Sequence, residues 1–486
     1  MKNMTAENMA KAAGGNLTGP QAMRQKEITE VVTDSRKIVS GCLFAAIRGN
    51  RTDGHAYIGQ AIRDGAGVIL AERLPEGTEA SVPVILVEDT LRALRDLAAY
   101  YLDQMNVSTV GIIGSAGKTN TKEMVASVLQ QKYRVLKTEG TFNNELGVPL
   151  TVFRIREEHE IAVIEMGINH FGEMCRLAQI VRPDTVVMTN IGTAHLEFLK
   201  SRDGILKAKS EVFEFLRPDG AVILNGDDDK LITLQQVNGI RPVFFGVHNT
   251  EADVYADHIQ LQDLTRVYCD VRYRREDVPG EYGRFRLAIP SPGIHAVQNA
   301  LAAAAAGLRY GLSEEEIMRG VDAYQGLRGR FHVLQTGSLT VIDDSYNANP
   351  SSMKGSLEIL QNGSGRRVAI LGDMGELGED TKSLHREVGV YAAGLQIDAL
   401  YMVGTLCRHM AEGAKAACEQ TAAKFREETG TDVGPARIPE IVWFPDRDSL
   451  MEKLADYIRP GDTILIKASR FMGFEKITDA LQKMGI

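Results

Sequence analysis

The stretch from Val110 to Met124, VGIIGSAGKTNTKEM, has the residue types of a loop that binds phosphate. An apolar run leads into the segment GSAGKT at residues 114–119. The common phosphate-binding pattern is Gly-x-x-x-x-Gly-Lys-[Ser/Thr], and Ile112 stands where its first glycine belongs. The sequence therefore contains a shorter loop, Gly-x-x-Gly-Lys-Thr.

The short loop still meets the physical requirements of a nucleotide site. A strand would deliver the chain to a glycine turn whose N–H groups face a phosphate, and the next helix would add its positive end. Lys118 would then contact the β- and γ-phosphates, and the Thr119 hydroxyl would bind Mg²⁺. The alternative is a tight turn that binds nothing. The helical face of Met124, Val125, Val128 and Leu129 after the loop favours the nucleotide site.

Two further groups follow apolar runs of the same region. Glu165 ends the run IAVIE, and His195 follows VVMTNIGTA. Because the carboxyl ends of parallel strands form the ligand edge of an open sheet, these groups would coordinate a second cation or orient a water molecule. The alternative for His195 is a loop histidine that only hydrogen-bonds backbone.

Composition limits the classes of function. The net charge of −9 excludes a general nucleic-acid or anionic-membrane binder, since both reward basic surfaces. The five cysteines form no C-x-x-C pair, which is typical of a reducing cytoplasm rather than a disulfide framework. The N-terminus has no apolar core of a signal peptide, and no apolar run reaches the ~18 residues of a membrane helix. We expect a cytoplasmic protein.

The elements that would position these residues fall in three stretches of the 486-residue chain. Short apolar runs in residues 1–105 predict a small mixed α/β domain. Residues 106–328 alternate apolar runs with helical stretches, which predicts an ATPase domain with a mostly parallel sheet and a small antiparallel one. The alternation restarts in residues 329–486 and predicts a Rossmann-like α/β domain. The predicted fold class is α/β in three domains.

Eight motifs appear in order along the chain: GSAGKT, TFNNELGVPLT, VIEMG, NIGTAHLE, AKSEVF, HAVQNALAA, GR and DDSYNANPSSM. In this order and spacing they resemble the Mur ligase family of peptidoglycan synthesis, whose phosphate loop has the short form. The resemblance covers essentially the whole chain. With DSRKIVSGCLFAAIRGNRTDGH and LGDMGELGE, it implies a monomeric ligase that adds D-alanyl-D-alanine to UDP-N-acetylmuramoyl-tripeptide, using ATP and an acyl-phosphate intermediate.

The resemblance also implies roles for single residues. The catalytic set is Lys118, Glu165, His195 and Lys209. Two Mg²⁺ ions are held by Thr119, Glu165, His195 and Lys209, the last as a carbamate. The nucleotide contacts Gly114, Ser115, Gly117, Lys118, Thr119, Asn299, Arg330, Asp344 and Asn347, with Asn349 in the same motif. Substrates contact Asp34, Ser35, Arg36, Asn143, Asn144, Lys467, Ser469 and Arg470. Without the family, Lys209 reads as an exposed helical lysine, and Asn143 and Asn144 as a capped turn.

Some interpretations stay open. Asp53, Gly54 and His55 would either bind the nucleotide sugar or shape a turn. The family's Gly-Lys-Thr-Thr reads Gly-Lys-Thr-Asn here, and Asn120 puts nucleotide affinity in doubt. Rival functions are the sister ligase that adds the third amino acid, folylpolyglutamate synthesis, and an ATP-binding homologue without catalysis. The first lacks support because no Asp-Asn-Pro-Arg motif is found in the chain. The sequence does not choose between meso-diaminopimelate and L-lysine as third residue.

Overall fold

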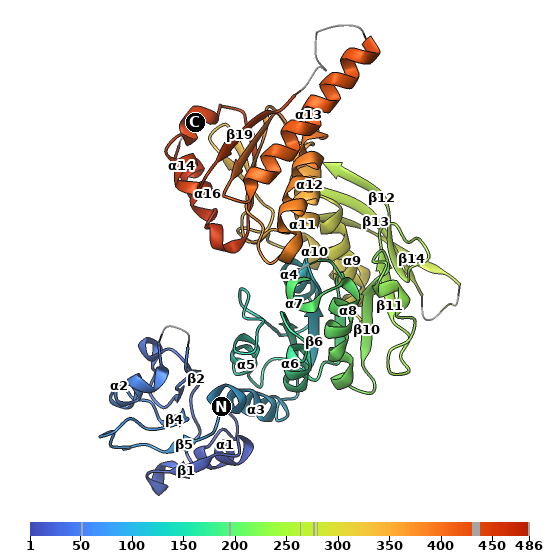
Figure 1. Ribbon diagram of the computed structural model, residues 1–486. Helices are drawn as coiled ribbons and strands as arrows, with labels where there is room; N and C mark the ends of the chain where they lie inside the picture. The colour runs from blue at the N-terminus through green and yellow to red at the C-terminus, as the bar shows by residue number, and fades with distance from the viewer. Residues whose placement is uncertain are drawn as a thin grey trace.

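The computed structural model describes residues 1–49, 52–193, 196–262, 264–275, 278, 280–429 and 438–484. Three β-sheets follow one another along the chain, each with its own helices, and they form an N-terminal, a central and a C-terminal unit (Figure 1). The central unit lies between the other two. Within the described residues, no helix is both long enough and apolar enough to cross a membrane.

The N-terminal sheet has five strands. Their spatial order is β1 (Asn16–Thr18), β5 (Val84–Leu86), β4 (Val68–Ala71), β3 (Leu43–Ala45) and β2 (Val31–Val32). Only the β1–β5 pair is antiparallel. The helices of this stretch are α1 (Ala6–Ala12), α2 (Ile58–Arg63) and α3 (Thr90–Leu102). One continuous apolar core joins this sheet through α3 to one face of the central sheet, so the two units are packed together.

The central sheet has nine strands. Their order is β14 (Tyr282–Ile289), β13 (Arg266–Arg274), β12 (Val254–Gln262), β11 (Val243–Gly246), β10 (Ala221–Asn225), β9 (Thr185–Met188), β6 (Ser108–Ile113), β8 (Ile161–Glu165) and β7 (Val135–Lys137). The strands from β7 to β12 are parallel, and β12, β13 and β14 are antiparallel. The predicted antiparallel part therefore extends the parallel sheet through the β11–β12 pairing.

Helices cover both faces of the parallel part of this sheet. They are α4 (Lys118–Leu129), α5 (Gly147–Val152), α6 (Glu173–Val181), α7 (Leu196–Leu199), α8 (Arg202–Ser210), α9 (Ile294–Arg309) and α10 (Glu314–Asp322). The alanine-rich α9 packs closely on α4, as its small residues predict. A methyl group on Gly320 of α10 would lie 2.4 Å from the Val128 backbone of α4. Close packing therefore fixes α4, the helix that follows the phosphate loop.

The C-terminal sheet has six strands. Their order is β15 (His332–Thr336), β16 (Leu339–Asp344), β20 (Thr463–Lys467), β17 (Arg367–Gly372), β18 (Ala399–Val403) and β19 (Glu440–Phe444). Only β15 pairs antiparallel. The helices are α11 (Pro350–Leu360), α12 (Thr381–Ala393), α13 (Cys407–Thr429), α14 (Arg447–Met451), α15 (Leu454–Tyr457) and α16 (Glu475–Lys483). The α/β class with three sheets and a mostly parallel central sheet is confirmed.

Each unit holds one fully buried free cysteine. Cys42 lies in the N-terminal unit, Cys269 on β13 and Cys407 at the start of α13. Burial raises the pKa of all three thiols, that of Cys269 to about 12. These thiols are buried and do not ionise at neutral pH, and the Cys407 thiol donates to the Leu371 carbonyl at 3.6 Å.

Candidate active site

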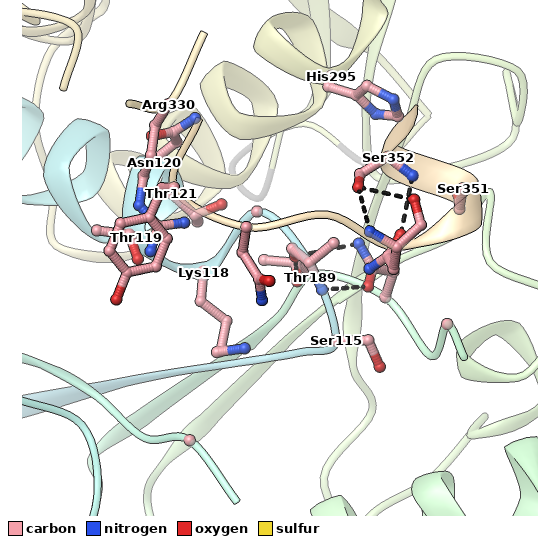
Figure 2. A pocket seen from close by; sticks show the side chains of 18 of the residues that line it. Ser115, Lys118, Thr119, Asn120, Thr121, Thr189, His295, Arg330, Ser351 and Ser352 are labelled. Carbon is pink, nitrogen blue, oxygen red and sulfur yellow. Dashed lines mark hydrogen bonds between the residues drawn. The ribbon is translucent and has the colours of Figure 1, made fainter. Parts of the chain in front are cut away.

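A cleft of about 1090 Å³ lies between the central and C-terminal units. The phosphate loop, the carboxyl ends of β8, β9 and β10, and the start of α9 form one wall. The start of α11 and the ends of β16 and β20 form the other. Figure 2 shows side chains from both walls, among them Lys118, Thr119 and Arg330, around this space. The sheet topology therefore brings groups from more than 300 residues of chain to one site.

The loop between β6 and α4 needs its two glycines. Gly114 has a φ of +149°, and a methyl group there would lie 1.9 Å from Thr189 Oγ1. Gly117 has a φ of +79° and precedes the first residue of α4. Both conformations are strained for residues with a side chain. The short motif therefore forms a turn between a strand and the N-terminus of a helix, a geometry that suits anion binding.

Two lysine side chains meet at the Gly114 carbonyl. Lys118 Nζ donates to this oxygen at 2.9 Å, and Lys209 Nζ donates to it at 3.0 Å. Lys209 is only 1% exposed, so its side chain lies inside the protein and is not the solvated lysine of the alternative interpretation. Burial lowers the pKa of Lys209 far below its usual range, and the Lys118 charge lowers it further. Burial also lowers the pKa of Lys118, against the attraction of Glu165.

Glu165 is 1% exposed at the end of β8. Its Oε1 accepts from Thr119 Oγ1 at 3.2 Å and from Asn143 Nδ2 at 2.8 Å. Its Oε2 is buried and accepts no hydrogen bond from any residue that the structure describes. An orphaned carboxylate oxygen beside a threonine hydroxyl is the oxygen donor set that Mg²⁺ takes. The residues present therefore fit a divalent cation at this point.

The side of the loop facing β9 is held by Asn190. Its Oδ1 accepts from Ala116 N at 2.9 Å, and its carbonyl accepts from Ser115 N at 3.0 Å. On the other side, Asn299 of α9 accepts from Thr121 Oγ1 at 2.8 Å. The Asn120 Oδ1 is buried and has no hydrogen-bond partner among the described residues, so the departure from the family motif leaves an acceptor free at the cleft.

The C-terminal unit contributes a carboxylate and two arginines that each lie near one aromatic ring. Asp344 accepts from Lys467 Nζ, which is 2% exposed. The Arg330 guanidinium carbon lies 3.9 Å from the centroid of the Tyr346 ring, and that of Arg470 lies 5.0 Å from it. Thus Lys467 and Arg470, which the family assigns to the incoming peptide, lie beside residues assigned to the nucleotide.

Tyr346 also joins the two walls of the cleft. Its Oη donates to Thr141 Oγ1 of the central unit at 2.9 Å. Thr141 belongs to the same loop as Asn143, which contacts Glu165. A single loop therefore connects the candidate metal ligand with the C-terminal unit.

Several predicted residues make structural contacts. Asn144 Oδ1 caps a turn by accepting from Gly147 N at 2.8 Å, and Asn349 caps α11 by accepting from Ser352 N at 2.9 Å. Asn347 Oδ1 accepts from its neighbour Ala348 N. Ser469 is buried and accepts from Gly375 N at 2.8 Å. Asn144, Asn347 and Asn349 line the cleft. His195 lies outside the described residues.

The N-terminal candidates lie away from this cleft and do not line it. Asp34, Ser35 and Arg36 lie at a short 3₁₀ turn, where the Arg36 side chain lowers the pKa of Asp34 to about 2. Asp53 caps the Gly54–Tyr57 turn, and its contact with His55 lowers the pKa of Asp53 to about 2. Neither of these two groups is among the described residues that line the cleft.

Sequence reasoning missed three polar residues that line the cleft, Thr141, Asn190 and Tyr346, and the buried Lys122 behind the phosphate loop. The burial of Lys122 could have been predicted, because this lysine falls on the apolar stripe of α4 with Val125, Ala126 and Leu129. Tyr346 stands within the quoted motif DDSYNANPSSM, but its partner Thr141 is 205 residues away, so no local pattern indicates the contact.

Comparisons with known proteins agree with this architecture. Three family models match consecutive stretches: the Mur ligase family catalytic domain at residues 27–102, the Mur ligase middle domain at 112–307 and the Mur ligase glutamate ligase domain at 329–470. The UDP-N-acetylmuramoyl-tripeptide–D-alanyl-D-alanine ligase of Bacillus subtilis is 35% identical over 99% of both chains.

Two solved structures are similar to the whole molecule. MurF from Acinetobacter baumannii has a TM-score of 0.86 at 32% identity and covers 99% of this chain and 98% of its own. The MurF ligase of Thermotoga maritima, solved in complex with ADP, has a TM-score of 0.78 at 26% identity over 93% and 97% of the two chains. The similarity therefore includes all three sheets.

The hydrogen bond between Tyr346 and Thr141 predicts a matched pair of variants. Tyr346→Phe and Thr141→Val each remove the same bond between the walls of the cleft, so each should weaken ADP binding by about threefold to tenfold. Calorimetry of the two variants and the double variant measures this coupling. The double variant should bind like either single one. Fully additive losses would show that the two hydroxyls act independently.

Proposed function

Because this chain belongs to the Mur ligase family, we propose that it joins D-alanyl-D-alanine to UDP-N-acetylmuramoyl-tripeptide and converts ATP to ADP and phosphate. The product is a precursor of peptidoglycan. The full-length relative from Bacillus subtilis, named for this reaction, gives the substrates. The observation that carries the chemistry is the short phosphate loop with Lys118, Thr119 and Glu165 converging at one end of the cleft.

The reaction needs an activated carboxyl group, because a carboxylate oxygen is a poor leaving group. The terminal carboxylate of the tripeptide attacks the γ-phosphorus of ATP, and the bond to the β-phosphate oxygen breaks to give an acyl phosphate and ADP. The amine of D-alanyl-D-alanine then attacks the acyl carbon. Phosphate leaves as the amide forms, and the amine loses a proton to solvent or a base.

Lys118 and the loop amides stabilise the charge that develops on the transferred phosphoryl group. Bound Mg²⁺ supplies further charge compensation at the phosphates. Thr119 and Glu165 would hold one ion, and His195 and the carbamate of Lys209 would complete a set for two. The orphaned Oε2 of Glu165 supports this assignment.

The environment of Lys209 supports the carbamate. A free ammonium repels Mg²⁺, whereas a carbamate offers anionic oxygen. Formation of a carbamate requires a neutral amine, whose nitrogen bonds to the carbon of CO₂ and then loses a proton. Burial lowers the pKa of Lys209 well below its usual range, which favours the neutral amine that carbamate formation requires.

The three units divide the substrates among them. We assign residues 1–105 to the nucleotide sugar with Asp34, Ser35 and Arg36, residues 106–328 to ATP, and residues 329–486 to the dipeptide. Asn299, Arg330 and Asp344 would hold the nucleoside from both sides of the cleft, and Asn143 with Lys467 and Arg470 would face the peptides. The reaction takes place in the cytoplasm, where ATP is available, and a single chain supplies all of these residues.

The proposed function predicts a specific substrate panel. Phosphate release should require UDP-N-acetylmuramoyl-tripeptide and D-alanyl-D-alanine together with ATP and Mg²⁺. Without the dipeptide, borohydride should trap the acyl phosphate by reducing the activated carboxyl group to an alcohol. Turnover with the UDP-muramoyl dipeptide and a single amino acid instead would identify the sister ligase. Full turnover without any trapped alcohol would remove the support for the acyl phosphate.

Lys118→Ala should reduce the ligation rate by on the order of 10³-fold or more, because it removes a cation from the transferred phosphoryl group. Lys132→Ala is a matched control, since Lys132 is an exposed lysine just beyond the end of the same helix. Steady-state phosphate release measures both variants. Near-normal turnover of Lys118→Ala would exclude the loop from the mechanism.

Lys209→Ala should be nearly inactive, and acetate should partly restore its activity by occupying the vacated ligand position. Lys207→Ala is the control, because Lys207 lies on the same helix but is exposed. In wild-type enzyme equilibrated with ¹³CO₂, NMR should show a carbamate signal that depends on Mg²⁺ and is absent in Lys209→Ala. A signal that Lys209→Ala retains would assign the carbamate to another lysine.

A further inference from the structure

Lys122 is a buried lysine that the proposed mechanism does not use. It lies on α4, one turn after Lys118, and its side chain is 0% exposed. Lysine is almost never fully buried unless its ammonium group is paired. The position is therefore costly for folding, and the contacts of the ammonium group indicate what it does.

All three hydrogens of the Lys122 ammonium have acceptors. Nζ donates to the Thr138 carbonyl at 2.7 Å and to the Gly140 carbonyl at 3.1 Å. The third partner is Glu123 Oε1 at 2.9 Å. Two of these three contacts hold the backbone that leaves β7, so the ammonium ties this backbone to the helix of the phosphate loop.

Both ends of the same backbone segment, residues 138–143, form hydrogen bonds with Glu165. Thr138 Oγ1 accepts from the Glu165 N–H at 3.0 Å, and Asn143 Nδ2 donates to Glu165 Oε1 at 2.8 Å. The Lys122 Nζ itself is 4.0 Å from Glu165 Oε2 and does not donate to it. Lys122 is thus connected to the carboxylate by hydrogen bonds only through the segment, and its direct contact is an ion pair at 4.0 Å.

We propose that Lys122 is a positioning residue whose ammonium group holds segment 138–143 in place, so that the Glu165 carboxylate presents its unpaired oxygen to the metal ion of the nucleotide. The inference rests on the proposed function, in which Glu165 is a Mg²⁺ ligand. No contact of Lys122 with the cleft is required, and it does not line the cleft.

Removing Lys122 should change metal affinity in opposite directions, depending on whether its role is to position the segment or only to contribute charge. A cation 4.0 Å from Glu165 Oε2 repels a second cation, so its removal tightens metal binding if charge is all that it contributes. If Lys122 holds the segment, its removal leaves two carbonyls without a donor, and the displaced carboxylate binds metal more weakly.

The test compares Lys122→Met with Lys137→Met. Lys137 donates to the same Glu123 carboxylate, but its side chain is 38% exposed and does not contact segment 138–143 through an ammonium hydrogen bond. Binding of Mn²⁺·ADP, measured by electron paramagnetic resonance, should weaken at least about tenfold in Lys122→Met and less than about twofold in Lys137→Met. Both variants are expected to melt below the wild-type protein, so melting alone does not distinguish them.

Unchanged or tighter Mn²⁺·ADP binding in Lys122→Met would overturn the proposal. If that variant does not fold by circular dichroism, Lys122→Gln replaces it with the same expected loss. Adding Asn143→Ala to Lys122→Met, or to Lys122→Gln, should cause no further loss of Mn²⁺·ADP binding, because both substitutions act through segment 138–143. Additive losses would also overturn the proposal. A wild-type protein that bound no Mn²⁺·ADP would contradict the proposed function itself.

Discussion

The convergence of two lysine amines on one carbonyl oxygen determines the geometry of the candidate site. The Gly114 carbonyl accepts from both Lys118 and Lys209, and residue 114 has a φ of +149°, a conformation that favours glycine. Burial lowers the pKa of both amines, and the Lys118 charge lowers that of Lys209 further. The proposed phosphate and carbamate sites therefore lie side by side at one carbonyl oxygen.

The parallel sheet is what makes this convergence possible. Strands β6, β8 and β9 end at the same edge, so the phosphate loop, Glu165 and Asn190 arrive together although they are far apart in sequence. The segment 138–143 then passes along this edge and contacts the C-terminal unit through Thr141. The candidate metal ligand Glu165, the phosphate loop and the second wall of the cleft are therefore connected through one segment.

Much of the fold could be predicted from the sequence, and the reasons for the failures are physical. The run at β8 is buried on both faces and was visible as an unbroken apolar stretch. The strand β19 has a weaker sequence signal, because it lies at the edge of its sheet and leaves Trp443 39% exposed. The family motif singled out Lys209 as a candidate, but the sequence does not show that Lys209 is buried while Lys207 of the same helix is exposed. The contact of Asp344 with Lys467 joins residues 123 positions apart and depends on the pairing of β16 with β20.

The three buried thiols have a consequence for how the molecule can be followed in solution. Cys42, Cys269 and Cys407 each belong to a different unit, and none of them can react with an alkylating agent until its own unit opens. Their rates of alkylation, read separately by mass spectrometry, distinguish opening of one unit from opening of all three. The three native thiols can therefore report the local unfolding of each unit, without any engineered probe.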